Sequence, residues 1–201
     1  MDLGLTYKNV PGGTAHWTFT GNGNYNNQSG DVAIVITKAN ASCVITPYNV
    51  PYDSNPHTAT GSCTGVIGEN LLGLNLSGTT HTNVGSYTND LWTFSDEAGN
   101  YNNTSGTVLD AITKLHITVT ADAKTKVVGQ PDPVLTFEIT FGSLYFGDTF
   151  TGMLTREPGE AVGTYAILQG SLSLPEYYDL TYAGADFTIV NATIFLPLVR
   201  H

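Results

Sequence analysis

An internal repeat constrains the fold of this chain more than any other feature of its sequence. The tripeptide Trp17-Thr18-Phe19 recurs as Trp92-Thr93-Phe94, and the segment Gly-Asn-Tyr-Asn-Asn occurs at residues 23–27 and again at 99–103. Each copy continues through Ser-Gly into an apolar run that ends in Ile-Thr-Lys. The offset between the copies is 75 to 76 residues. Self-similarity at a fixed period indicates that one folding unit is used more than once.

A weaker echo extends the repeat toward the C-terminus. Val84-Gly85-Ser86-Tyr87 is matched by Val162-Gly163-Thr164-Tyr165 at an offset of 78 residues. The unit is therefore about 77 residues long, which is within the size range of a small domain. The period predicts four segments: the C-terminal half of a unit at 1–38, a complete unit at 39–114, a complete but divergent unit at 115–190, and a C-terminal tail at 191–201.

The first segment is too short to fold as a complete unit. Chains below about 40 residues rarely bury enough apolar surface to fold without a disulfide, a metal or a partner. We therefore expect that Met1 is not a true domain start, and that either preceding sequence or another chain completes this half unit.

Short strand signals run through every unit. Alternating or apolar runs bounded by Gly, Asn, Asp or Pro predict strands; they occur at Val44–Thr46, Leu71–Leu76, Leu91–Ser95, Val108–Ile112, Leu115–Thr120 and Leu135–Thr140. Strands at even spacing, without a helical period, favour an all-β chain of tandem Ig-like β-sandwich repeats, the first one incomplete. A ubiquitin-like β-grasp fold is the alternative for the divergent last unit.

Composition and charge support this fold class and exclude several functions. Charged residues make up 12% of the chain, against about 25% in average soluble domains, and the net charge is −10. An acidic chain lacks the cations that nucleic acids and anionic membranes require, so we expect neither as a partner. The sequence holds no apolar run of about 18 residues and therefore predicts no membrane span. Its N-terminus also lacks a signal peptide.

Two sets of residues resemble a known family. In the middle unit they are Ile36 to Ala41, Pro47 to Val50, Tyr52-Asp53, Asn55 to Gly61 and Val84 to Tyr87; in the last unit they are Gly129 to Pro133, Thr151-Gly152, Arg156-Glu157, Gly159-Glu160, Val162 to Tyr165 and Tyr182 through Ile189. These stretches resemble the MBG repeat domains of large bacterial surface and secreted proteins. One departure is Val128, where such repeats commonly carry a Tyr before the Gly. The resemblance implies extracellular tandem β modules without catalytic residues.

The two cysteines, Cys43 and Cys63, both lie in the middle unit. A disulfide between its first two strands would close a loop of about 20 residues and stabilise the unit by roughly 3 kcal/mol. Two buried free thiols are the alternative, and a metal pair would need further ligands that the sequence does not offer. A disulfide would in turn favour an oxidising compartment.

Aromatic residues are the candidates for ligand contact. Trp17 and Trp92 occupy equivalent places in the repeat, which favours core anchors over a sugar-stacking platform. Four tyrosines lie in turn-rich segments where they could contact a glycan or a protein: Tyr48, Tyr52, Tyr177 and Tyr178. Hydroxyl groups that cap loops of the same domain explain these tyrosines equally well.

No pattern in the sequence predicts catalysis, a cofactor or a metal. Residues 61–65, Gly-Ser-Cys-Thr-Gly, have the outline of a nucleophile elbow, but no helix signal follows them. The five histidines are scattered without metal-ligand spacing. Asp90, Asp96 and Glu97 could hold calcium between loops, although their spacing does not form an EF-hand and solvated loop charge is the alternative.

These features together predict a non-catalytic segment of a bacterial cell-surface or secreted protein that acts as a stiff stalk or a multivalent adhesin. Neighbouring repeats of the same chain are its expected partners, with a glycan or a surface protein as a further one. Its expected location is extracellular, which presumes a signal peptide upstream. A carbohydrate-binding module attached to a secreted hydrolase is the alternative function.

Overall fold

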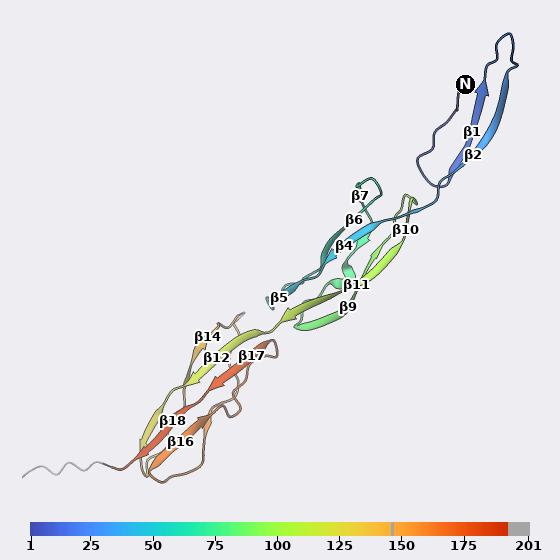
Figure 1. Cartoon of the computed structure of the whole chain (residues 1–201). Coiled ribbons are helices and arrows are strands. Elements are labelled where there is room, and N and C mark those ends of the chain that lie inside the picture. The colour runs from blue at the N-terminus through green and yellow to red at the C-terminus, as the bar shows by residue number, and fades with distance from the viewer. Residues whose placement is uncertain (146, 193–201) are drawn as a thin grey trace, which may run out of the picture. The chain divides into compact units, whose positions relative to one another are not determined.

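A computed structural model describes residues 1–145 and 147–192 of the chain (Figure 1). These residues form β-strands and one short 3-10 turn, η1 (Ser77–Thr79), which confirms the prediction of an all-β chain. They divide into two compact units: unit 1 comprises Met1–Val50 and Ser54–Ile112, and unit 2 comprises Pro51–Asp53 and the residues from Thr113 onward. Among the helical segments of the described chain, none has the length and apolar character needed to cross a membrane.

The first element of unit 1 is a twisted hairpin of β1 (Gly12–Phe19) and β2 (Gln28–Val35). The strands pair antiparallel, with Trp17 opposite Gly30. Asp2 extends this pair by one further bridge, because its backbone exchanges two hydrogen bonds of 2.9 Å with Thr18 at the free edge of β1.

The rest of unit 1 consists of two sheets and one short parallel pair. One sheet has the order β4 (Ser42–Thr46), β6 (Thr60–Thr64) and β7 (Asn70–Leu71); the other has the order β5 (Asn49–Pro51), β11 (Thr104–Thr113), β9 (Gly85–Phe94) and β8 (Leu74–Asn75); the parallel pair is β3 (Ala39–Asn40) with β10 (Tyr101–Asn102). Cys63, Phe94 and Tyr101 form the buried centre of this region, and Leu71, Leu74 and Trp92 pack around it.

The stretch Leu71–Leu76 differs from its predicted form as one strand. It is divided between β7 and β8, which belong to different sheets. The break falls at Gly73, whose φ of +105° is rarely accessible to other residues and whose Cβ, if present, would lie 2.0 Å from the Ser95 carbonyl oxygen. The glycine lets the chain pass from one sheet to the other.

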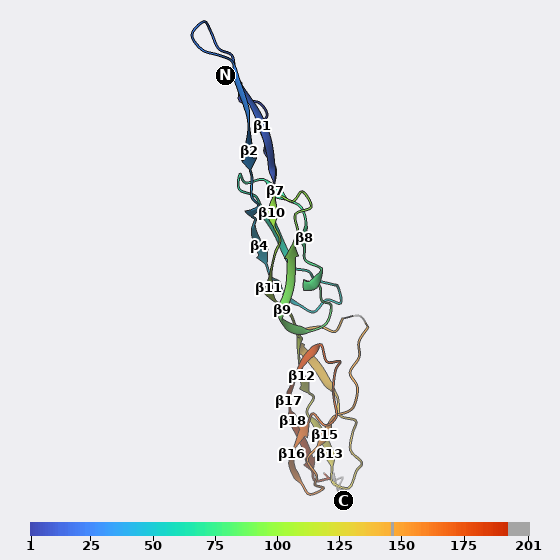
Figure 2. The same cartoon turned by 90° about the vertical axis from the view of Figure 1, so that its right-hand side faces the viewer.

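Unit 2 contains two sheets. Each sheet includes one strand from the beginning of the unit and one strand from its end. One has the order β14 (Phe137–Phe141), β12 (Leu115–Ala121) and β17 (Tyr178–Ala183); the other has the order β13 (Lys124–Val127), β18 (Ala185–Val190), β16 (Gly163–Leu168) and β15 (Thr155–Arg156). β12 pairs parallel with β17, and β13 pairs parallel with β18 (Figure 2). The first and last segments of the unit therefore run side by side through both sheets.

The core of unit 2 follows the period-two alternation of its strands. The inward residues of β12 are Ile117, Val119 and Ala121, and those of β18 are Phe187 and Ile189, all at most 5% exposed. Leu154, Ile167, Leu172 and Tyr178 complete the buried cluster. Residues 113–145 and 147–192 contain no helix of the kind that a ubiquitin-like fold packs on its sheet. Of the predicted tail, residues 193–201 lie outside the described part of the chain.

Candidate functional site

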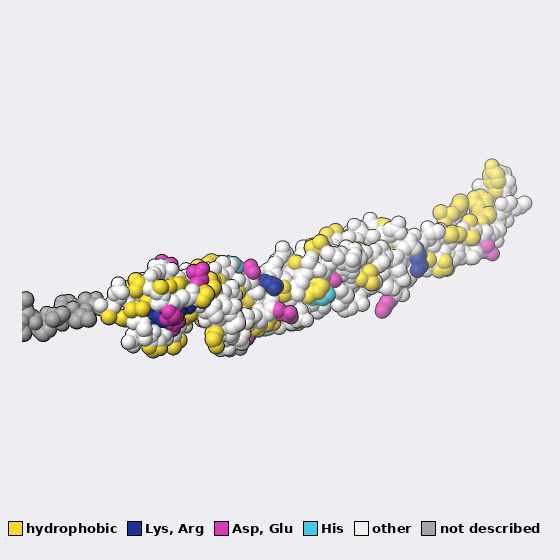
Figure 3. All heavy atoms as spheres, turned by 90° about the horizontal axis from the view of Figure 1, so that it is seen from below, with side chains coloured by type: hydrophobic (Ala, Val, Ile, Leu, Met, Phe, Trp, Pro, Cys, Tyr) yellow, Lys and Arg dark blue, Asp and Glu magenta, His cyan; other side chains and the backbone are white. Residues whose placement is uncertain are grey.

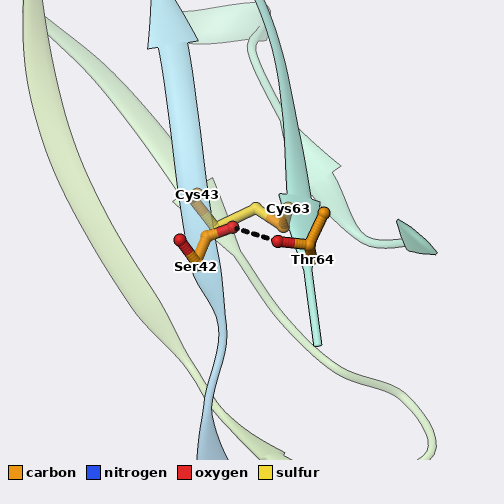
Figure 4. The surroundings of a disulfide bond; sticks show 4 residues. All are labelled: Ser42, Cys43, Cys63 and Thr64. Carbon is orange, nitrogen blue, oxygen red and sulfur yellow. Dashed lines mark hydrogen bonds between the residues drawn. A yellow bond between two sulfur atoms is a disulfide. The ribbon is translucent and has the colours of Figure 1, made fainter. Parts of the chain in front are cut away.

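Cys43 and Cys63 form a disulfide between β4 and β6 (Figure 4). The two residues face each other in the antiparallel register, with a Cα–Cα distance of 4.0 Å. Beside the bridge, the Thr64 hydroxyl donates a hydrogen bond of 3.4 Å to the Ser42 carbonyl oxygen. Cys63 is fully buried against Phe94, so the disulfide is part of the core of unit 1.

Three of the four candidate tyrosines come together in unit 2. The ring of Tyr52 stacks on that of Tyr177 at 4.5 Å, and Tyr178 lies next to Tyr177 at 5.0 Å. Both neighbouring hydroxyls donate to the Asp148 carboxylate, at 2.9 Å from Tyr177 and 3.0 Å from Tyr178. The hydrogen bond to Asp148, together with burial, raises the pKa of Tyr177 to about 12.

The Tyr178 hydroxyl has a second partner in its own unit. It accepts a hydrogen bond of 2.8 Å from the backbone N–H of Tyr145. The side chain is 4% exposed, and burial raises its pKa. Tyr178 therefore holds Tyr145 and Asp148 against the core, as the loop-capping alternative describes.

The fourth candidate, Tyr48, lies in unit 1 and belongs to a different cluster. Its hydroxyl donates a hydrogen bond of 3.3 Å to the Thr79 carbonyl oxygen, and its ring lies 5.7 Å from that of His57. Burial and the nearby Asp110 carboxyl raise the pKa of Tyr48 to about 12. The structure thus does not bring all four tyrosines into one binding surface.

Below Tyr48 lies a pair of buried carboxyl groups, Asp90 of β9 and Asp110 of β11. Asp110 is completely buried; its Oδ1 accepts a hydrogen bond of 2.8 Å from the Tyr48 backbone N–H, while its Oδ2 accepts none from a described donor. Burial raises the pKa of Asp110, and the neighbouring Asp90 carboxyl raises it further. Asp90 in turn lies 2.9 Å from Nε2 of His81, which stacks on Tyr87 at 3.5 Å. This arrangement favours the protonated form of the Asp110 carboxyl group.

Sequence reasoning missed this pair, although a signal for it exists. Asp110 interrupts the apolar run 108–112 at a position that points inward in a strand of period two. An acidic residue at an inward position is costly to bury unless it is neutral or hydrogen-bonded. The alternation alone could therefore have indicated the buried carboxyl group of Asp110.

Unit 2 contains a cluster of four charged side chains that the sequence did not reveal. Lys126 lies between Asp132, at 2.6 Å, and Glu160, and Arg156 bridges the same two carboxylates at 2.6 Å each. Arg156 also donates to the carbonyl oxygens of Glu157 and Gly159. Hydrogen bonds from Arg156 and Lys126 lower the pKa of Asp132 to about 2. All six ionic and backbone contacts lie within unit 2, where they tie β13 and β15 to neighbouring loops.

The three acidic residues considered for calcium are divided by the structure. Asp90 lies within β9 beside His81, whereas Asp96 follows the strand. Six residues of extended chain separate them, which is on the order of 20 Å. The Asp96 carboxylate accepts hydrogen bonds from the backbone N–H groups of Ala98, Asn100 and Tyr101. Within the described residues, no group of three His, Cys, Asp or Glu side chains has the geometry of a metal site.

The two tryptophans have the same cross-strand neighbour, a glycine, in the two copies of the repeat. Trp17 lies over Gly30 and Trp92 over Gly106, each glycine being the cross-strand partner of its tryptophan. A Cβ on Gly106 would approach the Trp92 ring to 2.8 Å, and one on Gly30 would approach the Trp17 ring to 3.0 Å. In both copies the indole ring therefore packs over a glycine, in the space that a side chain at that position would fill.

Comparison with known families finds one match, which lies in unit 2. Residues 117–188 match the family model of the MBG domain (YGX type). This match confirms the predicted resemblance to MBG-type repeats. MBG domains occur in extracellular surface proteins, and the match indicates a repeat domain of such proteins. No curated protein and no solved structure shows a significant match to the chain.

The core strands and the charged cluster of unit 2 lie inside the MBG match. The matched range runs from Ile117 in β12 to Thr188 in β18 and includes Lys126, Asp132, Arg156 and Glu160. Tyr177, Tyr178 and Asp148 also lie within it, whereas Tyr52 does not.

Proposed function

We propose that this chain is a non-catalytic structural and adhesive repeat segment of a bacterial cell-surface or secreted protein, acting as a stiff stalk or a multivalent adhesin. The observation that carries the proposal is that an MBG match at 117–188 follows two copies of one hairpin, both with the same Trp–Gly register. Repetition of a small module lengthens a protein without adding chemistry, and weak contacts on its loops gain strength through multivalency.

The side-chain contacts support a structural role. The hydroxyls of Tyr48, Tyr177 and Tyr178 all donate to groups of their own unit. The charged side chains of Lys126 and Arg156 are likewise bound to carboxylates of their own unit. Polar groups that bond within the fold rigidify a module rather than recognise a ligand.

The Cys43–Cys63 disulfide supports a location outside the cytoplasm. Disulfides persist in oxidising compartments and are rare where thiols are kept reduced. A bridge that spans β4 and β6 also limits how far the unit extends under load, because the chain between the two cysteines, which are 20 positions apart, cannot unravel.

Single-molecule pulling tests the stalk role. Unit 1 should unfold as a force peak whose length increment grows by about 70 Å when a reductant opens the disulfide, because about 20 residues of 3.6 Å each are released. The Cys43→Ala/Cys63→Ala variant should show the longer increment without reductant. Unfolding of both units without a measurable force peak would contradict the mechanical role.

The alternative, a carbohydrate-binding module, rests on the stacked rings of Tyr52 and Tyr177 beside Asp148. Aromatic faces with a nearby carboxylate are typical of sugar sites. A glycan array should separate the two functions. Specific retention that is lost in Tyr177→Ala and kept in Tyr25→Ala would favour the module, and absence of retention would favour the stalk.

A further inference from the structure

The hairpin of β1 and β2 presents an apolar face that no other described strand covers. A groove of about 450 Å³ lies on it, lined by Met1, Leu3, Ala15, Trp17, Val32 and Ile34. Figure 3 shows hydrophobic side chains gathered over this hairpin. Soluble proteins rarely leave such a contiguous apolar face without a partner.

The same hairpin occurs a second time in unit 1, as β9 and β11. The register is the same from Ala15 to Phe19 and from Asp90 to Phe94, and beyond that stretch β11 has a bulge between Val108 and Asp110 that β2 lacks. Thr18 pairs with Ser29 and Trp17 with Gly30 in the first copy; Thr93 pairs with Ser105 and Trp92 with Gly106 in the second. The edge contact is repeated as well, since Asp2 pairs with Thr18 where Asn75 of β8 pairs with Thr93. The second copy therefore indicates what the first copy is built to contact.

In the second copy, the sheet of β4, β6 and β7 covers the apolar face. Phe94 and Tyr101 pack there against Cys63, and they are 1% and 7% exposed. The equivalent residues of the first copy, Phe19 and Tyr25, are 37% and 68% exposed. The same side chains are thus core residues in one copy and surface residues in the other.

The two copies also differ in their polar contacts and in their strand pairing. The Tyr101 hydroxyl donates to the Glu69 carboxylate and accepts a hydrogen bond of 3.1 Å from the Val66 backbone N–H. The outer edge of β11 pairs with β5, whereas in the described residues β2 pairs with β1 alone. A partner that covers the first copy would supply two equivalent contacts. It would bring a turn with a carboxylate, equivalent to Glu69, and a strand that pairs with β2, equivalent to β5.

We propose that the exposed face of the β1–β2 hairpin is a docking surface for the first half of another repeat of this type. The occupant is a disulfide-linked antiparallel sheet with the pattern of residues 39–71. Its inward residues, equivalent to Cys63 and Leu71, cover Trp17 and Phe19, and its carboxylate, equivalent to Glu69, accepts the Tyr25 hydroxyl. The proposal concerns which segment covers the β1–β2 hairpin, and it does not depend on whether the protein serves as a stalk.

A fusion of the full chain tests the proposal. A second copy of residues 39–71, followed by a short Gly/Ser linker, is joined ahead of Met1, because Asp2 already occupies the edge position of β8. In a Trp92→Phe background, Trp17 reports on the hairpin alone. We expect a shift of Trp17 emission to shorter wavelength and at least about tenfold slower hydrogen exchange of the β1 and β2 amides.

The matched control is the same fusion with Leu71→Asp in the added copy, which should return both signals to those of the unfused chain. Unchanged Trp17 emission and unchanged hydrogen exchange in the first fusion would overturn the proposal. This holds also if the added copy stays unfolded, because a half unit of this kind folds only when it docks. Concentration-dependent protection of β1 and β2 in the unfused chain would assign the face to a second copy and would also overturn it.

Discussion

Phe19 and Phe94 hold the same place in two copies of one hairpin, yet only Phe94 is buried. The local structures agree at the two phenylalanines, since Ala15–Phe19 and Asp90–Phe94 have equivalent cross-strand pairs and each copy has an indole over a glycine. What differs is the sheet of β4, β6 and β7, which packs against the second copy only. The comparison teaches that a hairpin of this sequence forms its own register but acquires a core from the other half of the repeat.

The largest expected difference between the copies is the effect of removing the phenylalanine ring. Phe94→Ala should lower the free energy of unfolding of unit 1 by about 3–5 kcal/mol, because it leaves a cavity in the core. Phe19→Ala should cost less than about 1 kcal/mol, because its ring is partly solvated already. Urea unfolding followed by Trp92 fluorescence in a Trp17→Phe background measures both. Equal losses would contradict the exposure of Phe19.

The disulfide is the second difference, because the hairpin of β1 and β2 has no counterpart of it in the described residues. Cys43→Ala/Cys63→Ala should lower the stability of unit 1 by about 3 kcal/mol, since opening the loop of 20 residues gives the unfolded chain more freedom. Reductant should destabilise the wild-type chain to a similar extent. A further effect of reductant on the double variant would mean that the bridge does not account for the loss.

The buried carboxyl pair should make the stability of the second copy, but not of the first, depend on pH. At the positions of Asp90 and Asp110 the first copy has Ala15 and Ile34. Because the folded pKa of Asp110 is raised above 3.8, its contribution to stability is fully present below that pH and is lost as the pH rises through the raised value. Asp110→Asn should leave stability near pH 4 unchanged and increase it by about 1–2 kcal/mol at pH 7, because an amide at the same place carries no charge.

Thermal unfolding of unit 1 between pH 4 and pH 7 measures this effect of Asp110→Asn. Glu97→Gln, on an exposed loop of the same unit, serves as the control and should change little at either pH. A destabilised Asp110→Asn variant at pH 7 would mean that the carboxyl group is ionised and bound by a donor in the folded chain.

A smaller difference concerns the glycines under the indoles. Gly106→Ala should cost about 1 kcal/mol, because a Cβ would lie 2.8 Å from the Trp92 ring, which is held by the core. Gly30→Ala should be close to neutral, because Trp17 lies on an open face and moves aside. Denaturant midpoints of the two variants provide the measurement, and a greater loss for Gly30→Ala would reverse the ranking of the two faces.

The charged cluster of unit 2 should have the smallest effect and the opposite pH dependence. The pKa of Asp132 is lowered to about 2, so its contribution to stability is present above 3.8 and is lost as the pH falls toward 2. Asp132→Asn should lower the Tm of unit 2 by a few degrees at pH 7 and by much less at pH 2 or in 1 M salt. Asp186→Asn, an exposed carboxylate of the same unit, is the control. A shift that is the same at both pH values would exclude ionic pairing as its cause.

Much of the fold could be predicted from local pattern. The period-two alternation of Leu115–Thr120 predicts β12, and the repeat at Trp17 and Trp92 predicts equivalent strands. The stretch Leu71–Leu76 could not be predicted as two strands of different sheets, because its apolar residues carry no information about which sheet each one joins.

The candidate site was less accessible to prediction. Turn-rich context identified Tyr52, Tyr177 and Tyr178, but it could not reveal that they meet, since Tyr52 is far from the other two in sequence. Lys126 and Arg156 carried no local signal either, because their shared partners, Asp132 and Glu160, come from separate loops.

The sequence by itself determined the all-β class, the period of the repeat and the likeness of unit 2 to MBG domains, because strand alternation and repetition are properties of the chain read in order. Only the tertiary structure decided which copy of the hairpin has a core, which acidic residues share a buried site, and which tyrosines stack. These outcomes depend on contacts between residues distant in sequence, and such contacts decide whether the same side chain is buried or exposed to solvent.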